Sequence, residues 1–379
     1  MFTTEKMNTR QQFLNVMEYK PVNAVPNYEA GVWSQTAERW KSEGLDTSQL
    51  TWNWFWGENY FHLTPREYVR LNLGMIPQFE YTVLEEDDEY EIIRHGNGVV
   101  TRALKEGTSG GMRACMDQYL SFPVTDTASF RELKKRYVAS LPERYPADWQ
   151  SKLAAGWKNR EHVLVLGENC STLGFYWLAR EWMGTEGVSY AWYDEPMLMH
   201  EMMEFIADYT IEISKPILAE TDVDYVMLNE DMSMKNGPLL SPDTYKEFIY
   251  PHMRRLVDFF KQNGVKYMFV DSDGNPDLLV PLLLDAGVDG LWPLEHVSEA
   301  DPNVFRKKYG KQLRLTGGVD KMRIAQGRKE IDRHLTELCP LIEEGGFIPT
   351  IDHTVSPDVS LENFEYYMKR KIDMLNGRF

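Results

Sequence analysis

Two apolar segments in the second half of the chain are each followed by side chains that could transfer protons or bind a cation. VKYMFV precedes Asp271 and Asp273, and FIPTI precedes Asp352 and His353. On a continuing strand Asp271 and Asp273 would point the same way, which suits metal ligation or a shared proton, whereas an Asx turn closed by Gly274 is the structural alternative. His353 is compatible with a general acid, a metal ligand or a structural hydrogen bond, and its place at a strand end favours function.

Polar residues follow the other apolar segments as well. A single aspartate after a strand is usually a helix cap, but this explanation weakens as the number of such residues rises. Carboxylates that converge in a partly buried place require a cation, a metal ion or shared protons. We therefore predict that the strand ends form one ring of acidic side chains around His353. Its further members are Asn27, Tyr28 and Glu29, Glu168 and Asn169, Asn229, Glu230 and Asp231, Glu295 and His296, and Asp320.

The elements that would position this ring follow from the pattern after residue 160, where short apolar segments alternate with amphipathic stretches. Strict alternation of strands and helices indicates a parallel sheet. Roughly seven or eight such units favour closure into a TIM (β/α)8 barrel, in which catalytic groups lie at the C-terminal ends of the strands. An open doubly wound sheet is the alternative, although no GxGxxG follows the first strand. The expected strands are 23–29, 162–169, 223–231, 265–273, 287–295, 312–320 and 345–353, with helices at 242–264 and 328–346.

The first part of the chain predicts additions to the barrel. Residues 9–20 have the spacing of an amphipathic helix. Residues 79–104 alternate around the sequence His95-Gly96-Asn97-Gly98, which predicts a small antiparallel meander. We expect a single TIM-barrel domain over residues 1–379, with 30–160 as a helical and β-meander elaboration and 160–379 as most of the barrel.

Aromatic residues make up 13% of the chain, and many of them lie early, including Trp33 and Trp54. Packing in the core and an aromatic wall for a flat substrate are equally good explanations. The run Trp52-Asn53-Trp54-Phe55-Trp56 cannot all face one side of a single element.

Composition excludes several classes of protein. Lys and Arg number 41 against 58 Asp and Glu, which gives a formal charge of −17. Such a chain repels nucleic acid and anionic membranes, so neither is an expected partner. Three widely spaced cysteines without a CxxC motif fit a reducing compartment, and no apolar run suggests a signal or a membrane span. We therefore expect a cytoplasmic protein.

Several segments together resemble the uroporphyrinogen decarboxylase superfamily. The resemblance covers most of the chain and is most specific over 160–375. This superfamily has the TIM-barrel fold and contains porphyrinogen decarboxylases and corrinoid-linked methyltransferases. The segments are GPLLSPDTYKEFIYPHMRRLVDFFKQNG, VDSDGN, PLLLDAGVDGLWPLE and LTGGVDK.

Two departures distinguish the branches of this superfamily. The decarboxylases carry an arginine-bearing motif after the first strand, where this chain has Glu29, so a polycarboxylate porphyrinogen would be repelled. The thiol-methylating branch binds zinc through His and Cys, where this chain has Asp271, Asp273 and the region of His353. The segments YEAGVWSQTAERWKSEGL, REWMGTEGVSYAWYDEP and NEDMSMKNGP are similar to the O-demethylase-type methyltransferases of anaerobic bacteria.

The resemblance implies transfer of a methyl group from a methoxyaromatic or related methylated donor to the cobalt of a corrinoid protein. A decarboxylase or lyase acting on a small non-porphyrin substrate is the alternative, and a catalytically silent member that binds a corrinoid or a partner protein is a third reading. The corrinoid would be carried by the partner protein. Whether the chain binds zinc is left open, and a homodimer is compatible with this class of soluble enzyme. The candidate catalytic residues are His353, Asp273, Asp271 and Glu230; Glu230, Asp271 and His353 are the tentative metal ligands; Glu29, Tyr28, Trp33, Trp54, Glu168, Asn229 and Glu295 are the candidate substrate-binding residues.

Overall fold

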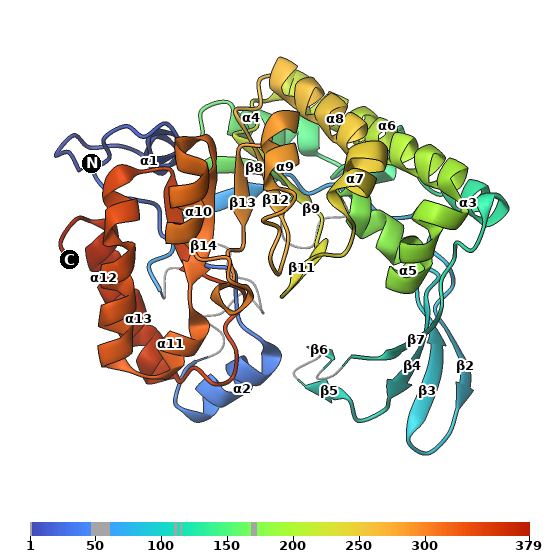
Figure 1. The fold of residues 1–379 in the computed structure, drawn as a ribbon, viewed down its shortest axis with the longest axis horizontal. Coiled ribbons are helices and arrows are strands. Elements are labelled where there is room, and N and C mark those ends of the chain that lie inside the picture. The colour runs from blue at the N-terminus through green and yellow to red at the C-terminus, as the bar shows by residue number, and fades with distance from the viewer. Residues whose placement is uncertain (1, 47–60, 110–111, 114–115, 168–172) are drawn as a thin grey trace.

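The structure is a computed structural model that describes residues 2–46, 61–109, 112–113, 116–167 and 173–379. Trp54 and Glu168, both expected at the substrate site, lie outside these described residues. The fold is mixed α/β, with a curled parallel sheet surrounded by helices and a small antiparallel sheet beside it (Figure 1). The expected fold class, a TIM-like barrel with a small β extension, is confirmed.

The parallel sheet has seven strands among the described residues, in the order β1-β8-β9-β12-β13-β14-β15. Every neighbouring pair is parallel, so the C-terminal ends of all seven strands lie at one edge. Buried apolar residues fill β8, β9, β12 and β15 almost without alternation, because both faces of the sheet are covered. The strands are β1 (Arg66–Tyr68), β8 (Val163–Gly167), β9 (Tyr225–Asn229), β12 (Tyr267–Asp271), β13 (Gly290–Trp292), β14 (Arg314–Val319) and β15 (Phe347–Ile351).

The expected first strand at 23–29 is wrong, and β1 was not expected. Residues 25–30 have no ladder pairing, because their hydrogen bonds go to other groups: the Val25 amide donates to the Leu375 carbonyl. At the edge of β15 a side chain replaces a backbone acceptor, since the Ile351 amide donates to Oε2 of Glu29 at 2.8 Å. The described strands therefore form an incompletely closed barrel, and this segment lies against its open edge.

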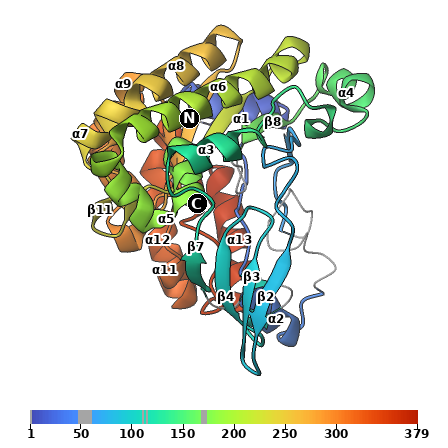
Figure 2. The same ribbon diagram turned by 90° about the vertical axis from the view of Figure 1, so that its right-hand side faces the viewer.

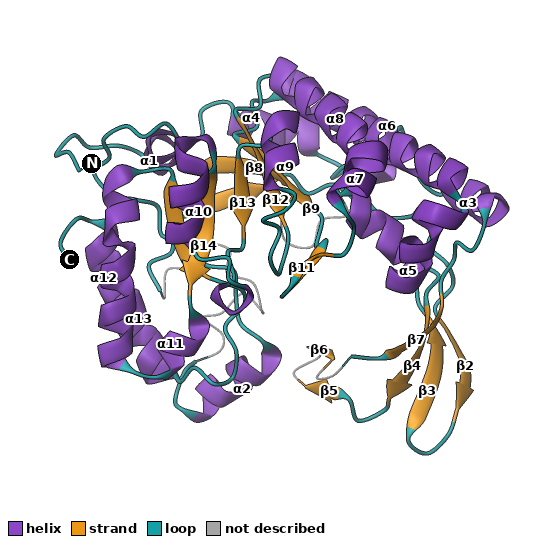
Figure 3. Ribbon diagram, viewed as in Figure 1, coloured by secondary structure: helices purple, strands orange, loops and turns teal. Residues whose placement is uncertain are grey.

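Helices form the outer layer around the strands, as Figure 3 shows. The expected helix over 242–264 consists of α7, a π-helical turn at Tyr245–Ile249 and α8. The helices are α1 (Thr9–Met17), α2 (Ser34–Ser42), α3 (Thr127–Lys134), α4 (Ala154–Trp157), α5 (Phe175–Asp194), α6 (Pro196–Glu220), α7 (Pro242–Thr244), α8 (Tyr250–Gln262), α9 (Val280–Ala286), α10 (Pro302–Tyr309), α11 (Lys321–Ala325), α12 (Arg328–Glu344) and α13 (Leu361–Leu375). None of the helices in the described part of the chain is long and apolar enough to cross a membrane.

The expected meander is confirmed as a four-stranded antiparallel sheet in the order β2-β3-β4-β7, which projects from the helical layer below α3 (Figure 2). At its predicted turn the His95 amide donates to the Val99 carbonyl at 2.8 Å. Two short hairpins, β5/β6 and β10/β11, complete the β structure. The strands are β2 (Thr82–Glu86), β3 (Tyr90–Arg94), β4 (Val100–Leu104), β5 (Thr108–Ser109), β6 (Met112–Arg113), β7 (Gln118–Ser121), β10 (Ser233–Met234) and β11 (Gly237–Pro238).

Candidate active site

The loop after β12 turns sharply at Gly274. Gly274 has φ +78°, and a Cβ atom there would lie 2.7 Å from backbone atoms of Met234, so only glycine fits without displacing the β10/β11 hairpin. Asp271 is buried at the end of β12, whereas the Asp273 side chain is 38% exposed. The turn thus separates the two aspartates, with only Asp273 reaching towards solvent.

His353 and Asp273 come together at this end of the barrel, as two strand-end residues in the predicted ring should. Nε2 of His353 lies 3.4 Å from Oδ2 of Asp273, and Nδ1 lies 2.9 Å from Oγ1 of Thr354. Burial alone would lower the pKa of His353, but the carboxylates of Asp273 and Glu295 outweigh it and raise the pKa above its ordinary value. A protonated imidazole is therefore favoured at this position.

An aromatic ring lies next to this pair. The Trp33 ring centroid is 6.3 Å from that of His353, with an interplanar angle of 34°, and Trp33 is 41% exposed. Residues 31–33 are held there by bridging backbone bonds to Val355, which follows the strand that positions His353. Trp33 therefore offers an exposed indole beside the proton-carrying group.

Glu295, Lys321 and Asp352 form the adjoining part of the site. Oε2 of Glu295 accepts from the Gly274 amide at 2.8 Å, and its Oε1 lies 3.8 Å from Nζ of Lys321. Burial and the nearby charge of Asp273 raise the pKa of Glu295. Lys321 was not predicted as a site residue from the sequence. It follows β14 and Asp320, the N-cap residue of α11, in the same way as the acidic residues follow their strands.

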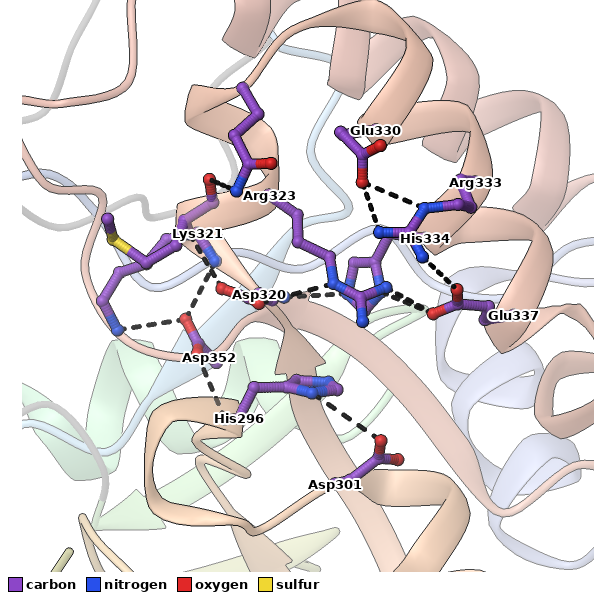
Figure 4. Close-up of polar contacts among 12 residues, drawn as sticks. His296, Asp301, Asp320, Lys321, Arg323, Glu330, Arg333, His334, Glu337 and Asp352 are labelled. Carbon is purple, nitrogen blue, oxygen red and sulfur yellow. Dashed lines mark hydrogen bonds and ion pairs between the residues drawn. The ribbon is translucent and has the colours of Figure 1, made fainter.

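A larger polar network extends from Lys321 to α12 (Figure 4). The Asp320 amide donates to Nε2 of His334 at 2.9 Å, and Nδ1 of His334 lies 3.6 Å from Oε2 of Glu337. Because Nε2 accepts a hydrogen bond, His334 is neutral with its proton on Nδ1. Burial, His296 and Arg323 lower the pKa of His334 to about 4.

Stability is expected to fall with acidification because of His334. The unfolded chain binds a proton at the ordinary pKa of 6.5 and the folded chain only at about 4, so stability is intact above pH 6.5 and is lost as the pH falls to about 4. The contribution of this residue over that window is about 3 kcal/mol. Urea unfolding at pH 7 and pH 5 should show a clearly smaller pH dependence in His334→Gln than in the parent. Equal slopes in the two proteins would refute this assignment.

Glu230 occupies a structural position. It is fully buried, and its two carboxylate oxygens accept from the amides of Phe175 at 3.0 Å and Tyr176 at 2.7 Å. A carboxylate at the first turn of α5 satisfies orphan amides and interacts favourably with the helix dipole. Burial nevertheless raises the pKa of Glu230 to about 7. This capping role accounts for an acid after β9 without any contact to a substrate.

Glu29 is also enclosed by protein groups. Its Oε1 accepts from Nζ of Lys371 and from the hydroxyl of Tyr367, each at 2.6 Å, and Oε2 binds the Ile351 amide. Lys371 also donates to the carbonyl oxygen of Tyr28 at 2.7 Å. These contacts tie the segment before α2 to β15 and α13 at the open edge of the barrel.

The remaining expected residues lie in or near the barrel interior. Tyr28 is buried with its ring 4.5 Å from the guanidinium of Arg66, and Asn229 is buried at the end of β9. A cavity inside the barrel is lined by aromatic and aliphatic side chains together with Glu29, Arg66 and two threonines. Its aromatic lining residues are Phe13, Tyr28, Tyr225, Phe269 and Trp292.

No three His, Cys, Asp or Glu side chains within the described ranges are grouped so that they could hold a metal ion. The tentative ligand set Glu230, Asp271 and His353 is therefore not assembled. The reason lies in the contacts above: Glu230 binds the start of α5, and His353 faces Asp273 instead.

Comparisons with known proteins agree with this fold. The family model for uroporphyrinogen decarboxylase (URO-D) matches residues 176–371, just over half of the chain. A methyltransferase from Methanosarcina mazei superposes with a TM-score of 0.57 and 12% identity, covering 97% of this chain and 99% of that chain. The chain is an α/β enzyme built on a TIM-like barrel, and it belongs to the uroporphyrinogen decarboxylase family.

Two curated relatives match shorter stretches of the chain, at higher sequence identity than the Methanosarcina mazei protein. The uroporphyrinogen decarboxylase of Campylobacter lari is 23% identical over 141 residues, which cover 34% of this chain and 37% of that protein. The uroporphyrinogen decarboxylase of Hydrogenovibrio crunogenus is 23% identical over 189 residues, covering 47% and 49% respectively. The chain thus spans less than half the length of each of these relatives.

Proposed function

We propose that this chain is a methyltransferase that moves a methyl group from a methoxyaromatic donor to the cobalt of a corrinoid protein. The observation that carries the proposal is the His353–Asp273 pair beside the exposed ring of Trp33. It combines an imidazole whose pKa is raised by neighbouring carboxylates with an aromatic surface at the C-terminal ends of the strands, where barrel enzymes hold their reacting groups.

The reaction depends on protonation of the leaving oxygen, because the cobalt nucleophile needs no activation by the enzyme. Cobalt(I) attacks the methyl carbon with its electron pair, the carbon–oxygen bond breaks, and its electrons go to the aryl oxygen. Transfer of a proton from the His353 imidazolium to that oxygen releases a neutral phenol, and solvent then restores the proton. General acid catalysis of this kind contributes about 10²–10⁴-fold to a rate.

The other groups support binding and charge balance in this proposal. Asp273 holds His353 protonated, Trp33 packs against the donor ring, and Glu295 lies next to Asp273. Roles in donor orientation for Tyr28, Glu29 and Asn229, and for Trp54 and Glu168 outside the described residues, remain proposals. The acceptor corrinoid is a substrate on its partner protein, and among the described residues no group of His, Cys, Asp and Glu side chains could hold a zinc ion.

Decarboxylation of a small substrate is the second candidate, because the family model and the two curated relatives carry that name. At the mouth Asp273, Glu295 and Asp352 face the two cations His353 and Lys321, so acidic groups outnumber basic ones. An excess of carboxylates disfavours an anionic substrate with several carboxylates of its own. The charge at the mouth therefore favours methyl transfer from an ether over decarboxylation of a substrate with several carboxylates.

The test is methyl transfer to free reduced cobalamin, followed by the absorbance change from cob(I)alamin to methylcobalamin. We expect the full chain to demethylate at least one member of a panel of methoxyaromatics and to leave methylamines unchanged. His353→Ala is the matched control, because it keeps the barrel but removes the proton-donating side chain. A panel left untouched by the parent protein would refute the proposal.

Trp33→Ala is expected to raise KM for an aromatic donor roughly tenfold, since it removes apolar contact worth about 1–2 kcal/mol. Trp33→Phe should recover most of the loss, because a ring remains. The measurement is the initial rate at varied donor concentration. An unchanged KM in the alanine variant would show that Trp33 does not bind the donor.

A further inference from the structure

Lys321 joins two carboxylates that come from different strand ends. Its Nζ is 3.1 Å from Oδ1 of Asp352 and 3.8 Å from Oε1 of Glu295. The Lys321 side chain is 16% exposed, compared with 1% for Asp352 and 14% for Glu295. Figure 4 shows Lys321 pointing towards Asp352 from the start of α11. Carboxylates this buried need a counter-charge, and Lys321 provides it for both.

Each of these carboxylates also holds a backbone amide with its second oxygen. Oε2 of Glu295 accepts from Gly274 at 2.8 Å, and Oδ2 of Asp352 accepts from His296 at 3.3 Å. The first of these contacts fixes the loop after β12, and the second fixes the residue that follows Glu295. A single cation after β14 therefore connects the ends of β12, β13 and β15.

The loop fixed by Glu295 is the one that carries Asp273. Gly274 directly follows Asp273, whose Oδ2 is 3.4 Å from Nε2 of His353. With the Gly274 amide bonded to Glu295, Asp273 is restrained next to His353. Loss of that bond would leave the loop held mainly by the amides of Ser272 and Asn275, which donate to the carbonyls of Trp292 and Met234.

We propose that Lys321 is a positioning residue, which holds Asp273 against His353 through Glu295 and the Gly274 amide. Its catalytic consequence rests on the proposed methyl transfer, but its structural consequence does not. Without Lys321, Glu295 loses one counter-charge while the like charge of Asp273 stays beside it, so Glu295 shifts away or takes up a proton. In either case its hydrogen bond to Gly274 weakens.

The experiment compares Lys321→Met and Lys321→Arg in the full chain, with Lys321→Gln as a second charge-removing variant. Hydrogen–deuterium exchange of peptides covering 272–276 reports on the loop directly. We expect exchange in Lys321→Met to be about tenfold faster than in the parent and exchange in Lys321→Arg to be close to it. The matched control is Lys215→Met, which breaks an exposed ion pair with Glu212 on α6 and should leave this loop unchanged.

The kinetic readout separates positioning from binding. Lys321→Met should lower kcat for methyl transfer by about tenfold with KM for the donor within about twofold, and should add nothing in an Asp273→Asn background. Unchanged exchange in both Lys321→Met and Lys321→Gln would overturn the inference. Faster exchange in a chain whose parent transfers no methyl group would support the positioning role and refute only the proposed function.

Discussion

His353→Ala is expected to lower kcat for methyl transfer by about 10²–10⁴-fold, because the phenolate would leave without a proton. In this structure the imidazole has a raised pKa, since Asp273 and Glu295 outweigh the opposing effect of burial. These carboxylates therefore stabilise the charged form of the acid. Steady-state rates with reduced cobalamin and an unactivated methoxyaromatic measure the effect.

The leaving group provides the control for this prediction. A nitro-substituted methoxybenzene releases a stable phenolate, so the same variant should lose much less rate with that donor. Asp273→Asn should shift the basic limb of the parent pH profile to lower pH, because the carboxylate that favours the imidazolium is gone. An equal loss with both donors would mean that His353 orients the substrate and does not protonate it.

Lys371→Met is expected to reduce the free energy of unfolding by about 3–5 kcal/mol, because it leaves the carboxylate of Glu29 buried without its cation. The two side chains are 0% and 1% exposed, and their charged atoms are 2.6 Å apart. Burial lowers the pKa of Lys371 while Glu29 opposes this shift, which makes the pair interdependent. Urea denaturation followed by circular dichroism measures the change.

Removing both partners distinguishes two contributions to the free energy of unfolding: the loss caused by one unpaired buried charge, and the net stabilisation from the ion pair itself. Glu29→Leu combined with Lys371→Met should be considerably more stable than Lys371→Met alone, because no buried charge remains. A loss below about 1 kcal/mol in the single variant would mean that water reaches Glu29. In that case Glu29 would be available to a substrate as originally expected.

The strands of the second half of the chain could be predicted because they are buried on both faces. Segments such as VKYMFV and FIPTI are continuous apolar runs, and each lies within the strand expected for it, in β12 and β15. The segment at 23–29, NAVPNYE, is less apolar, and it forms no ladder: its Val25 amide donates to Leu375, and its Glu29 side chain accepts from Ile351. Composition does not reveal that a side chain takes the place of a backbone acceptor. This arrangement depends on Glu29 and on α13, which follows more than 300 residues later.

The candidate site could be predicted only in part, for a related reason. A polar residue after a strand is visible in the sequence, but the direction of its side chain is not. His353 and Asp273 point to each other, whereas Glu230 turns inward to the start of α5. A partly buried acidic cluster also requires a cation, and Lys321 supplies it at a strand end where the sequence predicts only the acid Asp320.

A doubly labelled donor tests the central claim most directly. The donor is a methoxybenzoate with carbon-13 in both its methoxy and carboxyl carbons, incubated with the full chain and reduced cobalamin. Methyl transfer predicts labelled methylcobalamin and a hydroxybenzoate that keeps its carboxyl label. Labelled carbon dioxide without methylcobalamin would contradict the account and support decarboxylation instead.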